Sequence, residues 1–128
     1  MNLKPGVIGT GCFRLGTILH ELLHVLGFHH QHVAANRDEY INVNWDNIRP
    51  KFKMNFFHDH RNQLLGNFGE DYDYNSVMHY ARNAFSINRG SQTLEPKKEG
   101  SENMGQRIHL SRKDIIKLNR MYKCPGYV

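Results

Sequence analysis

The sequence predicts a domain of the α+β class, because patterns typical of helices and of strands both occur along its 128 residues. Residues 17–26 are apolar on nearly all sides, which is typical of a buried helix. Residues 41–45 alternate between apolar side chains and asparagine, which is typical of a short strand. Residues 111–122 begin with a capping pair and carry an apolar face, so we expect a second helix there. No repeat or internal boundary divides the chain, and we expect residues 1–128 to form one domain.

The first helix is expected to follow a loop, because residues 1–16 contain four glycines and one proline. Thr17 is suited to the N-cap position of this helix. Apolar side chains then surround two histidines: Ile18, Leu19, Leu22, Leu23, Val25 and Leu26. Gly27 can adopt the left-handed backbone conformation that ends a helix, so we expect the chain to reverse direction there.

The middle of the chain is expected to contain a shorter helix and a hairpin. Asp46 or Asn47 can cap the helix, and Pro50 is tolerated in its first turn. The apolar residues of this helix recur at every fourth position: Ile48, Phe52 and Phe56. Between residues 84 and 94, two short apolar runs flank a turn that contains Gly90, which indicates a hairpin.

The last helix is predicted by Ser111 and Asp114, whose spacing is that of a capping box. Its apolar face is expected to comprise Ile115, Ile116, Leu118, Met121 and Tyr122. The densest basic stretch of the chain lies on the same helix, and we interpret it as a solvated face: Arg112, Lys113, Lys117, Arg120 and Lys123. Although the net charge is +5, no nucleic-acid-binding module is recognisable, so we expect no nucleic-acid partner.

No apolar run is long enough to cross a membrane, so we expect no membrane partner. Lys4, Pro5 and Gly6 interrupt any apolar core of a signal peptide at the start of the chain. The two cysteines, Cys12 and Cys124, could pair with each other, but two cysteines do not fix a connectivity.

The most informative stretch is residues 20–30, HELLHVLGFHH. His20 and His24 are four apart on the expected helix, so their side chains share one face and can bind one metal ion. Glu21 stands beside that face, where a general base could take a proton from a metal-bound water. After the reversal at Gly27, His30 could return as a third ligand. Three neutral imidazoles and an open fourth position are typical of a catalytic zinc site.

The alternative is that these histidines are core residues without a ligand, but the full spacing with Gly27 and His30 rarely arises by chance. A second metal site at His58 and His60 is conceivable, and we favour a solvated surface cluster there.

Taken together, these motifs resemble the astacin family of metzincins, which are secreted zinc endopeptidases with the pattern H-E-x-x-H-x-x-G-F-x-H. Further family segments follow in order: RDEY at residues 37–40, WDNI at 45–48, YDYNSVMHY at 72–80, GQR at 105–107, LS at 110–111 with Asp114, and YKC at 122–124. The resemblance covers essentially the whole chain and implies a zincin-like α+β catalytic domain.

The resemblance implies roles for individual residues. His20, His24 and His30 would be the ligands of one Zn²⁺, and Glu21 would be the general base. Met78 would form an apolar floor beneath the histidines. Tyr80 would be the phenol that ligates zinc at rest and donates a hydrogen bond to the oxyanion during catalysis. We therefore expect catalytic roles for Glu21 and Tyr80.

The chain also departs from the family. Gln31 stands where the family has a glutamate that contacts the freed N-terminus, and Ala34 and Asn36 replace the usual arginine and aspartate. The N-terminal sheet of the family is largely missing, so we expect a partial domain in which apolar side chains of the zinc helix face water. By resemblance, Cys12 and Cys124 each form a disulfide with a cysteine upstream of this chain, so we expect two free thiols here.

We therefore expect a secreted, monomeric zinc endopeptidase that acts on proteins or peptides. One alternative is a gluzincin, in which a distant glutamate is the third ligand, but Gly27 and His30 argue against it. Another is an inactive zinc-binding interaction module, which retention of Glu21 and Tyr80 disfavours. A basic nucleic-acid binder is the third alternative.

Overall fold

A computed structural model describes residues 3–58 and 67–126 of the chain. Two α-helices and two strands are named in it: α1 (Leu15–Val25), β1 (Ile41–Val43), β2 (Leu94–Pro96) and α3 (Arg112–Met121). Short 3-10 helices connect them: Gly11–Phe13, Gln31–Val33, Arg37–Glu39, Trp45–Asn47 and Pro50–Phe56. Helices and an antiparallel sheet occur together, so the predicted α+β class is confirmed.

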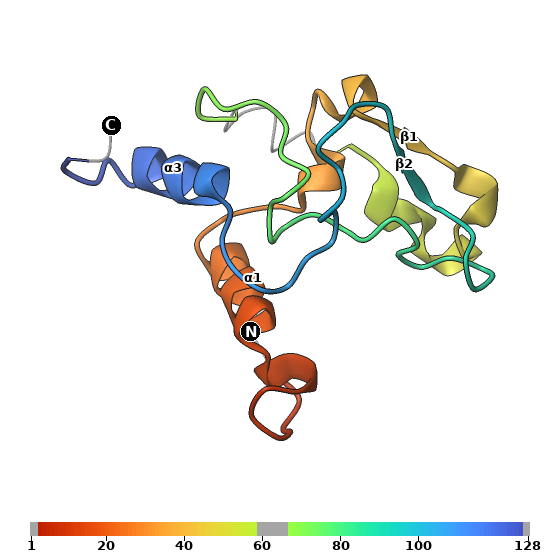
Figure 1. Cartoon of the computed structure of the whole chain (residues 1–128), viewed down its shortest axis with the longest axis horizontal. Coiled ribbons are helices and arrows are strands. Elements are labelled where there is room, and N and C mark those ends of the chain that lie inside the picture. Colours follow the sequence, from red (N-terminus) through yellow and green to blue (C-terminus); the bar gives the residue numbers. More distant parts are fainter. Residues whose placement is uncertain (1–2, 59–66, 127–128) are drawn as a thin grey trace.

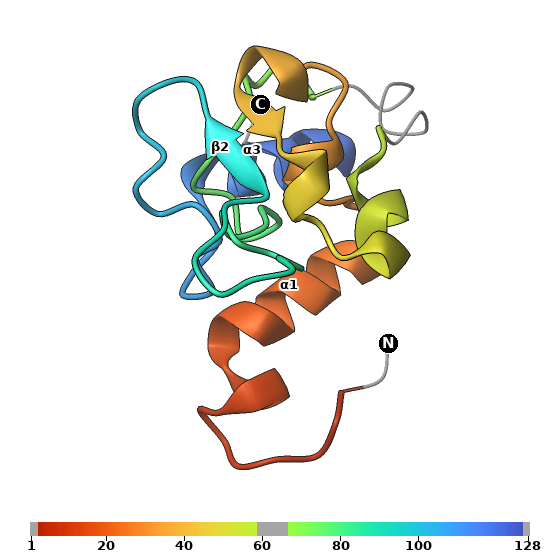
Figure 2. The same ribbon diagram turned by 90° about the vertical axis from the view of Figure 1, so that its right-hand side faces the viewer.

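The helix α1 lies below most of the chain in both views, with the N-terminal segment extending beyond it (Figures 1 and 2). It begins at Leu15, and its N-cap is Arg14, without a side-chain hydrogen bond, so the prediction of Thr17 as the N-cap is wrong. The prediction of a helix buried on nearly all sides is wrong, because Leu15 and Val25 are 67% and 64% exposed. Its buried residues are Gly16, His20 and Leu23. Apolar side chains of the helix therefore face water, as we expected for a partial domain.

One face of α1 packs tightly against the loop before α3. A Cβ atom added at Gly16 would lie 2.0 Å from the carbonyl carbon of Arg107, so any larger side chain would force the two segments apart. Glycine at this position therefore permits a direct contact between the backbone of α1 and the backbone of residues 107–108.

The strands β1 and β2 pair antiparallel, with Ile41 opposite Pro96 and Val43 opposite Leu94. The predicted hairpin over residues 84–94 is therefore wrong, because Leu94 pairs with a strand far earlier in the chain. Ile41 and Leu94 are both fully buried in one core cluster, and this shared burial selects the long-range pairing.

The apolar residues between the strands are buried as expected, although the backbone differs. Ile48 and Phe56 are fully buried, and Phe52 packs partly buried against the same cluster. The expected helix is a 3-10 helix, Pro50–Phe56, and its proline lies in the first turn. Trp45, which we expected in the strand, begins a separate 3-10 helix, because β1 ends at Val43.

The helix α3 begins with the predicted capping box. The Ser111 hydroxyl accepts a hydrogen bond from the Asp114 N–H at 2.9 Å, and the Asp114 carboxylate accepts one from the Ser111 N–H at 3.0 Å. The predicted apolar face is only partly buried, because Ile115 and Tyr122 are exposed. The buried residues of this helix are instead Asp114 and Lys117. Lys117 therefore does not belong to the solvated basic face on which we placed it.

Within the described residues, no helix is both long enough and apolar enough to cross a membrane. In the same part of the chain, Cys12 and Cys124 are not bonded to each other.

Candidate metal centre

Three histidines meet at one end of α1. His20 and His24 lie one turn apart on the helix, and Gly27, with φ of +95°, turns the chain so that His30 returns beside them. The His30 Nε2 atom lies 3.1 Å from Nε2 of His24 and 3.3 Å from Nε2 of His20. The three residues predicted as ligands are therefore brought together.

This spacing fits a single zinc ion. Nitrogen atoms bound at about 2.05 Å and tetrahedral angles lie about 3.3 Å apart. The three ligand nitrogens all lie within 4.8 Å of one another. Lone pairs that face each other at such distances repel unless a cation lies between them. The donor set is therefore suited to Zn²⁺ in both chemistry and spacing.

Hydrogen bonds to backbone carbonyls orient two of the imidazoles. His20 Nδ1 bonds the Val77 carbonyl at 2.8 Å, and His24 Nδ1 bonds the Phe28 carbonyl at 2.8 Å. A carbonyl oxygen only accepts, so Nδ1 carries the proton in each ring. The lone pair is then on Nε2, the atom that faces the other histidines.

Burial keeps the imidazoles of His20 and His30 neutral. Desolvation is the largest cause of the lowered pKa of His20 and of His30, and the pKa of His30 falls to about 3. The neighbouring histidines lower the pKa of His30 further, because each disfavours a positive charge on the others. Neutral rings leave their lone pairs available to a metal at neutral pH.

The turn at residues 77–78 lies against these histidines. Val77 and Met78 are fully buried and form a cluster with Leu23 of α1. The Val77 carbonyl bonds His20, and the Met78 carbonyl accepts the Gln31 N–H at 3.0 Å, directly after His30. Met78 is therefore in the core beside the histidines, as the sequence predicted.

Asp114 of α3 fastens this turn. Its carboxylate accepts hydrogen bonds from the Ser76 hydroxyl at 2.6 Å and from the Val77 N–H at 2.9 Å, in addition to the capping bond from Ser111. The backbone of one residue, Val77, thus connects α3, through its N–H, with His20, through its carbonyl. Only the capping role of Asp114 was predictable, because spacing along one helix carries no information on this long-range contact.

Replacing Asp114 with alanine should lower the free energy of unfolding by about 3 kcal/mol or more, because buried donors at Ser76 and Val77 would lose their acceptor. Zinc affinity should fall by about tenfold, because His20 would lose its fixed carbonyl partner. Urea denaturation and a competitive zinc titration measure the two effects. Asp71→Ala, at an exposed position, is the matched control. Equal stability of the two variants would contradict this role for Asp114.

The residue after the third histidine, Gln31, is buried and accepts a hydrogen bond from the Lys117 ammonium at 3.1 Å. Burial lowers the pKa of Lys117, while Asp73 and Asp114 nearby favour its charged form. A neutral amide at position 31 therefore contacts a cation of the same chain.

Tyr80 lies beside the histidine cluster. Its ring centroid is 4.5 Å from that of His30, and burial raises the pKa of Tyr80, so the phenol keeps its proton at neutral pH. Glu21 is partly buried on α1, and its charge acts on both His20 and Arg107. Both predicted catalytic residues are thus near the three histidines.

Arg107 is a further charged group near the site, and the sequence motifs predict no individual role for it. Its guanidinium donates a hydrogen bond to the His79 carbonyl at 3.0 Å and interacts electrostatically with Tyr80 and Glu21. Burial lowers the pKa of Arg107. The only sequence feature that could have indicated a role for Arg107 near the site is its place in the GQR segment.

A groove of about 550 Å³ runs beside the cluster. It is lined by His24, His29, His30, Val33, Met54, Asn55, Phe57, His58 and Tyr80. The predicted surface cluster of His58 and His60 is described only in part. His58 Nε2 lies 3.0 Å from Oδ2 of Asp38, and His60 lies outside the described residues.

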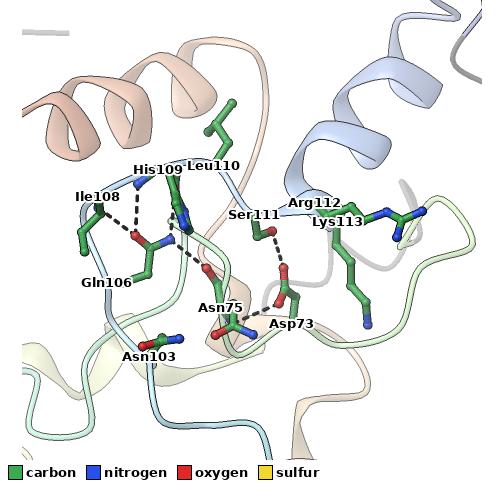
Figure 3. Close-up of a pocket in the computed structure, with 10 residues that line it drawn as sticks. All are labelled: Asp73, Asn75, Asn103, Gln106, Ile108, His109, Leu110, Ser111, Arg112 and Lys113. Carbon is green, nitrogen blue, oxygen red and sulfur yellow. Dashed lines mark hydrogen bonds between the residues drawn. The ribbon is translucent and has the colours of Figure 1, made fainter.

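A second hollow of about 530 Å³ lies at the start of α3, and none of the three clustered histidines lines it (Figure 3). Gln106 spans it, donating to the backbone carbonyls of Asn75 and His109 and accepting from the Ile108 N–H. Asp73 accepts a hydrogen bond from the Ser111 hydroxyl on the same wall. These polar groups bond to one another and thereby hold the loop that carries Arg107. Because they serve this structural role, we assign no ligand to this hollow.

The chain is similar to known proteins over nearly its whole length. The family model described as Astacin, a peptidase family, matches residues 4–123. Seminal metalloprotease 1 of Drosophila melanogaster is 54% identical over 128 residues, which are 100% of this chain and 51% of that protein. Astacin-like metalloendopeptidase of Mus musculus is 49% identical over 124 residues, 97% of this chain and 27% of that protein.

Among solved structures, high choriolytic enzyme 1, a hatching enzyme zinc-protease from Oryzias latipes, matches with a TM-score of 0.82 and 41% identity. The match covers 89% of this chain and 55% of that chain. The chain thus spans about half the length, or less, of these relatives.

Proposed function

The chain belongs to the astacin family of metallopeptidases, and on this basis we propose that it is a zinc-dependent endopeptidase that hydrolyses peptide bonds in proteins. The observation that carries the proposal is the convergence of three imidazole nitrogens within 4.8 Å beside Glu21 and Tyr80. The fold is the metzincin α+β fold that the sequence predicted.

His20, His24 and His30 would hold the zinc ion through Nε2, with Val77 and Phe28 orienting the first two rings. A zinc ion bound there supplies Lewis acidity, which lowers the pKa of a water toward about 7 and polarises a carbonyl. We propose one ion per chain, bound by this three-histidine cluster.

Glu21 acts as the general base. Its carboxylate takes a proton from the attacking water and later delivers that proton to the leaving amine nitrogen. The guanidinium of Arg107 interacts electrostatically with this carboxylate.

Tyr80 supplies a hydrogen-bond donor. Because burial raises the pKa of its phenol, the proton is present at neutral pH and can be donated to the oxygen that becomes negative in the transition state. Such a donor commonly contributes about a hundredfold or more to the rate.

The simplest test is hydrolysis of casein by the zinc-loaded protein. We expect a chelator to abolish cleavage and one equivalent of zinc per chain to restore it. Cleavage that persists at full rate after removal of zinc, with zinc loss verified by metal analysis, would refute the proposal.

The same assay separates the second candidate function, an inactive zinc-binding interaction module. The three-histidine cluster would bind zinc in such a module as well. Zinc binding at one equivalent without any cleavage would identify such a module.

We further propose that the protein acts as a secreted monomer on proteins or peptides, with residues 1–128 forming one domain. Family membership supports the substrate class and the extracellular location.

A further inference from the structure

His32 lies two residues after His30 but outside the three-histidine cluster. Its side chain is 0% exposed, and its Nε2 donates a hydrogen bond to the Asn55 carbonyl at 2.9 Å. The other ring nitrogen, Nδ1, is buried and has no hydrogen-bond partner among the described residues. A buried polar atom without a partner is costly, so hydrogen bonding alone does not explain an imidazole at this position.

The face of the His32 ring lies against Tyr80. The two ring centroids are 3.9 Å apart and the ring planes differ by 23°, which is a stacked arrangement. Phe56 contacts the edge of His32, with centroids 5.2 Å apart and planes at 64°. The hydrogen bond and the Phe56 contact therefore hold the imidazole, while its face remains available to the tyrosine.

Tyr80 has other aromatic neighbours, but none of those described stacks on it. His30 lies at 4.5 Å and 54°, Phe85 at 5.5 Å and 55°, and Phe56 at 5.9 Å and 74°. Among the described ring contacts of Tyr80, only the one with His32 is near-parallel, and such a stack favours one orientation of the ring plane.

The backbone on which His32 stands is also fixed. The Gln31 N–H bonds the Met78 carbonyl, and the Val33 N–H bonds the His30 carbonyl at 3.2 Å. His32 therefore connects the segment that carries the third histidine with the side chain of Tyr80.

We propose that His32 is a positioning residue for Tyr80, holding the phenol beside His30 by stacking on its ring rather than by binding metal. The inference rests on the proposed function, in which Tyr80 acts at the metal centre. Loss of the stack should weaken the contact of Tyr80 with a bound metal ion and lower kcat. Each effect should be about threefold to tenfold, the range expected for one aromatic pair.

The test compares His32→Leu, which removes the ring, with His32→Phe, which keeps a ring able to stack but loses the bond to Asn55. Phe52→Leu is the matched control, because Phe52 belongs to the same aromatic cluster and its described ring contact is with Phe85, at 4.4 Å. If His32→Leu does not fold, as judged by circular dichroism, His32→Gln replaces it.

The first measurement uses the Cu²⁺-loaded protein, because imidazoles bind Cu²⁺ and a coordinated phenolate gives a visible charge-transfer band. The wild type should show a band that is absent from Tyr80→Phe. His32→Leu should weaken this band at least about threefold, whereas His32→Phe and Phe52→Leu should retain it. A band of wild-type intensity in His32→Leu, or no band in the wild type, would overturn the inference.

The second measurement is a double-mutant cycle on the kcat of casein hydrolysis by the zinc-loaded protein. His32→Leu should lower kcat by about threefold to tenfold when Tyr80 is present. In the Tyr80→Phe background the same substitution should lower kcat by less than about twofold. Equal effects in the two backgrounds would show that His32 acts independently of Tyr80. A His32-dependent copper band in a protein that cleaves nothing would instead support the positioning role and refute the proposed function.

Discussion

Glu21→Gln should abolish peptide hydrolysis and leave zinc binding intact. Glutamine keeps the size of the side chain and its place on α1, but an amide cannot accept and return a proton at neutral pH. General acid–base groups contribute about 10²–10⁴-fold, so kcat should fall by roughly that factor. Casein or peptide turnover and zinc content per chain are the two measurements.

Glu95→Gln, on the exposed side of β2, provides the matched control for loss of one negative charge. It should leave both turnover and zinc content unchanged. Turnover of Glu21→Gln within about tenfold of the wild type would mean that another group accepts the proton. Loss of zinc from that variant would place Glu21 among the metal ligands.

His30→Ala should remove the zinc ion. His30 Nε2 lies 3.1 Å and 3.3 Å from the other two Nε2 atoms, so its loss would leave only the two proposed ligands on α1. Loss of a group that merely orients a ligand costs about 10–100-fold in metal affinity, and loss of the ligand itself should exceed this range. A competitive zinc titration measures the affinity, and the zinc-dependent rise in Tm should disappear with it.

His29→Ala is the control for this experiment, since His29 lines the same groove but is not a member of the cluster. It should bind zinc as the wild type does. A gluzincin, which takes a distant glutamate as third ligand, would retain zinc in His30→Ala. If His30→Ala bound zinc with unchanged affinity, the third ligand would have to be a carboxylate elsewhere in the chain.

The part of the site that the sequence predicted depends on local geometry. Two histidines four apart share a helix face whatever surrounds the helix, and Gly27 allows the reversal that returns His30. The capping box at Ser111 and Asp114 is equally local, and both of its hydrogen bonds are present. The motif therefore sufficed to predict the three-histidine cluster and the start of α3.

The errors arose where distant segments decide the outcome. A helix that is apolar on nearly all sides should be buried, yet Leu15 and Val25 of α1 are exposed, because no described segment packs over them. Leu94 pairs with β1 rather than with residues 84–88, since both strands bury a side chain in the same core. Periodicity within one segment does not identify its partner.

The same reasoning explains the groups near the site whose roles no sequence pattern predicted. Asp114 and Lys117 belong to a charged helix that resembles a surface helix, but both are buried because Ser76, Val77 and Gln31 offer them partners. His32 lies within a polar stretch and has no spacing to Tyr80 that a single sequence could reveal. Such contacts follow only from the assembled chain.

The peptide contacts at Val77 give α3 a role in the thermodynamics of the metal centre. Its N–H is held by Asp114 of α3, and its carbonyl orients His20 of α1. With His20 as a zinc ligand, docking of α3 and occupancy of the site share this residue, so their free energies are linked and the coupling is reciprocal. Docking of α3 would therefore tighten zinc binding by the same factor by which bound zinc tightens the docking of α3. The C-terminal helix, which contributes no ligand, is in this sense an effector of the site.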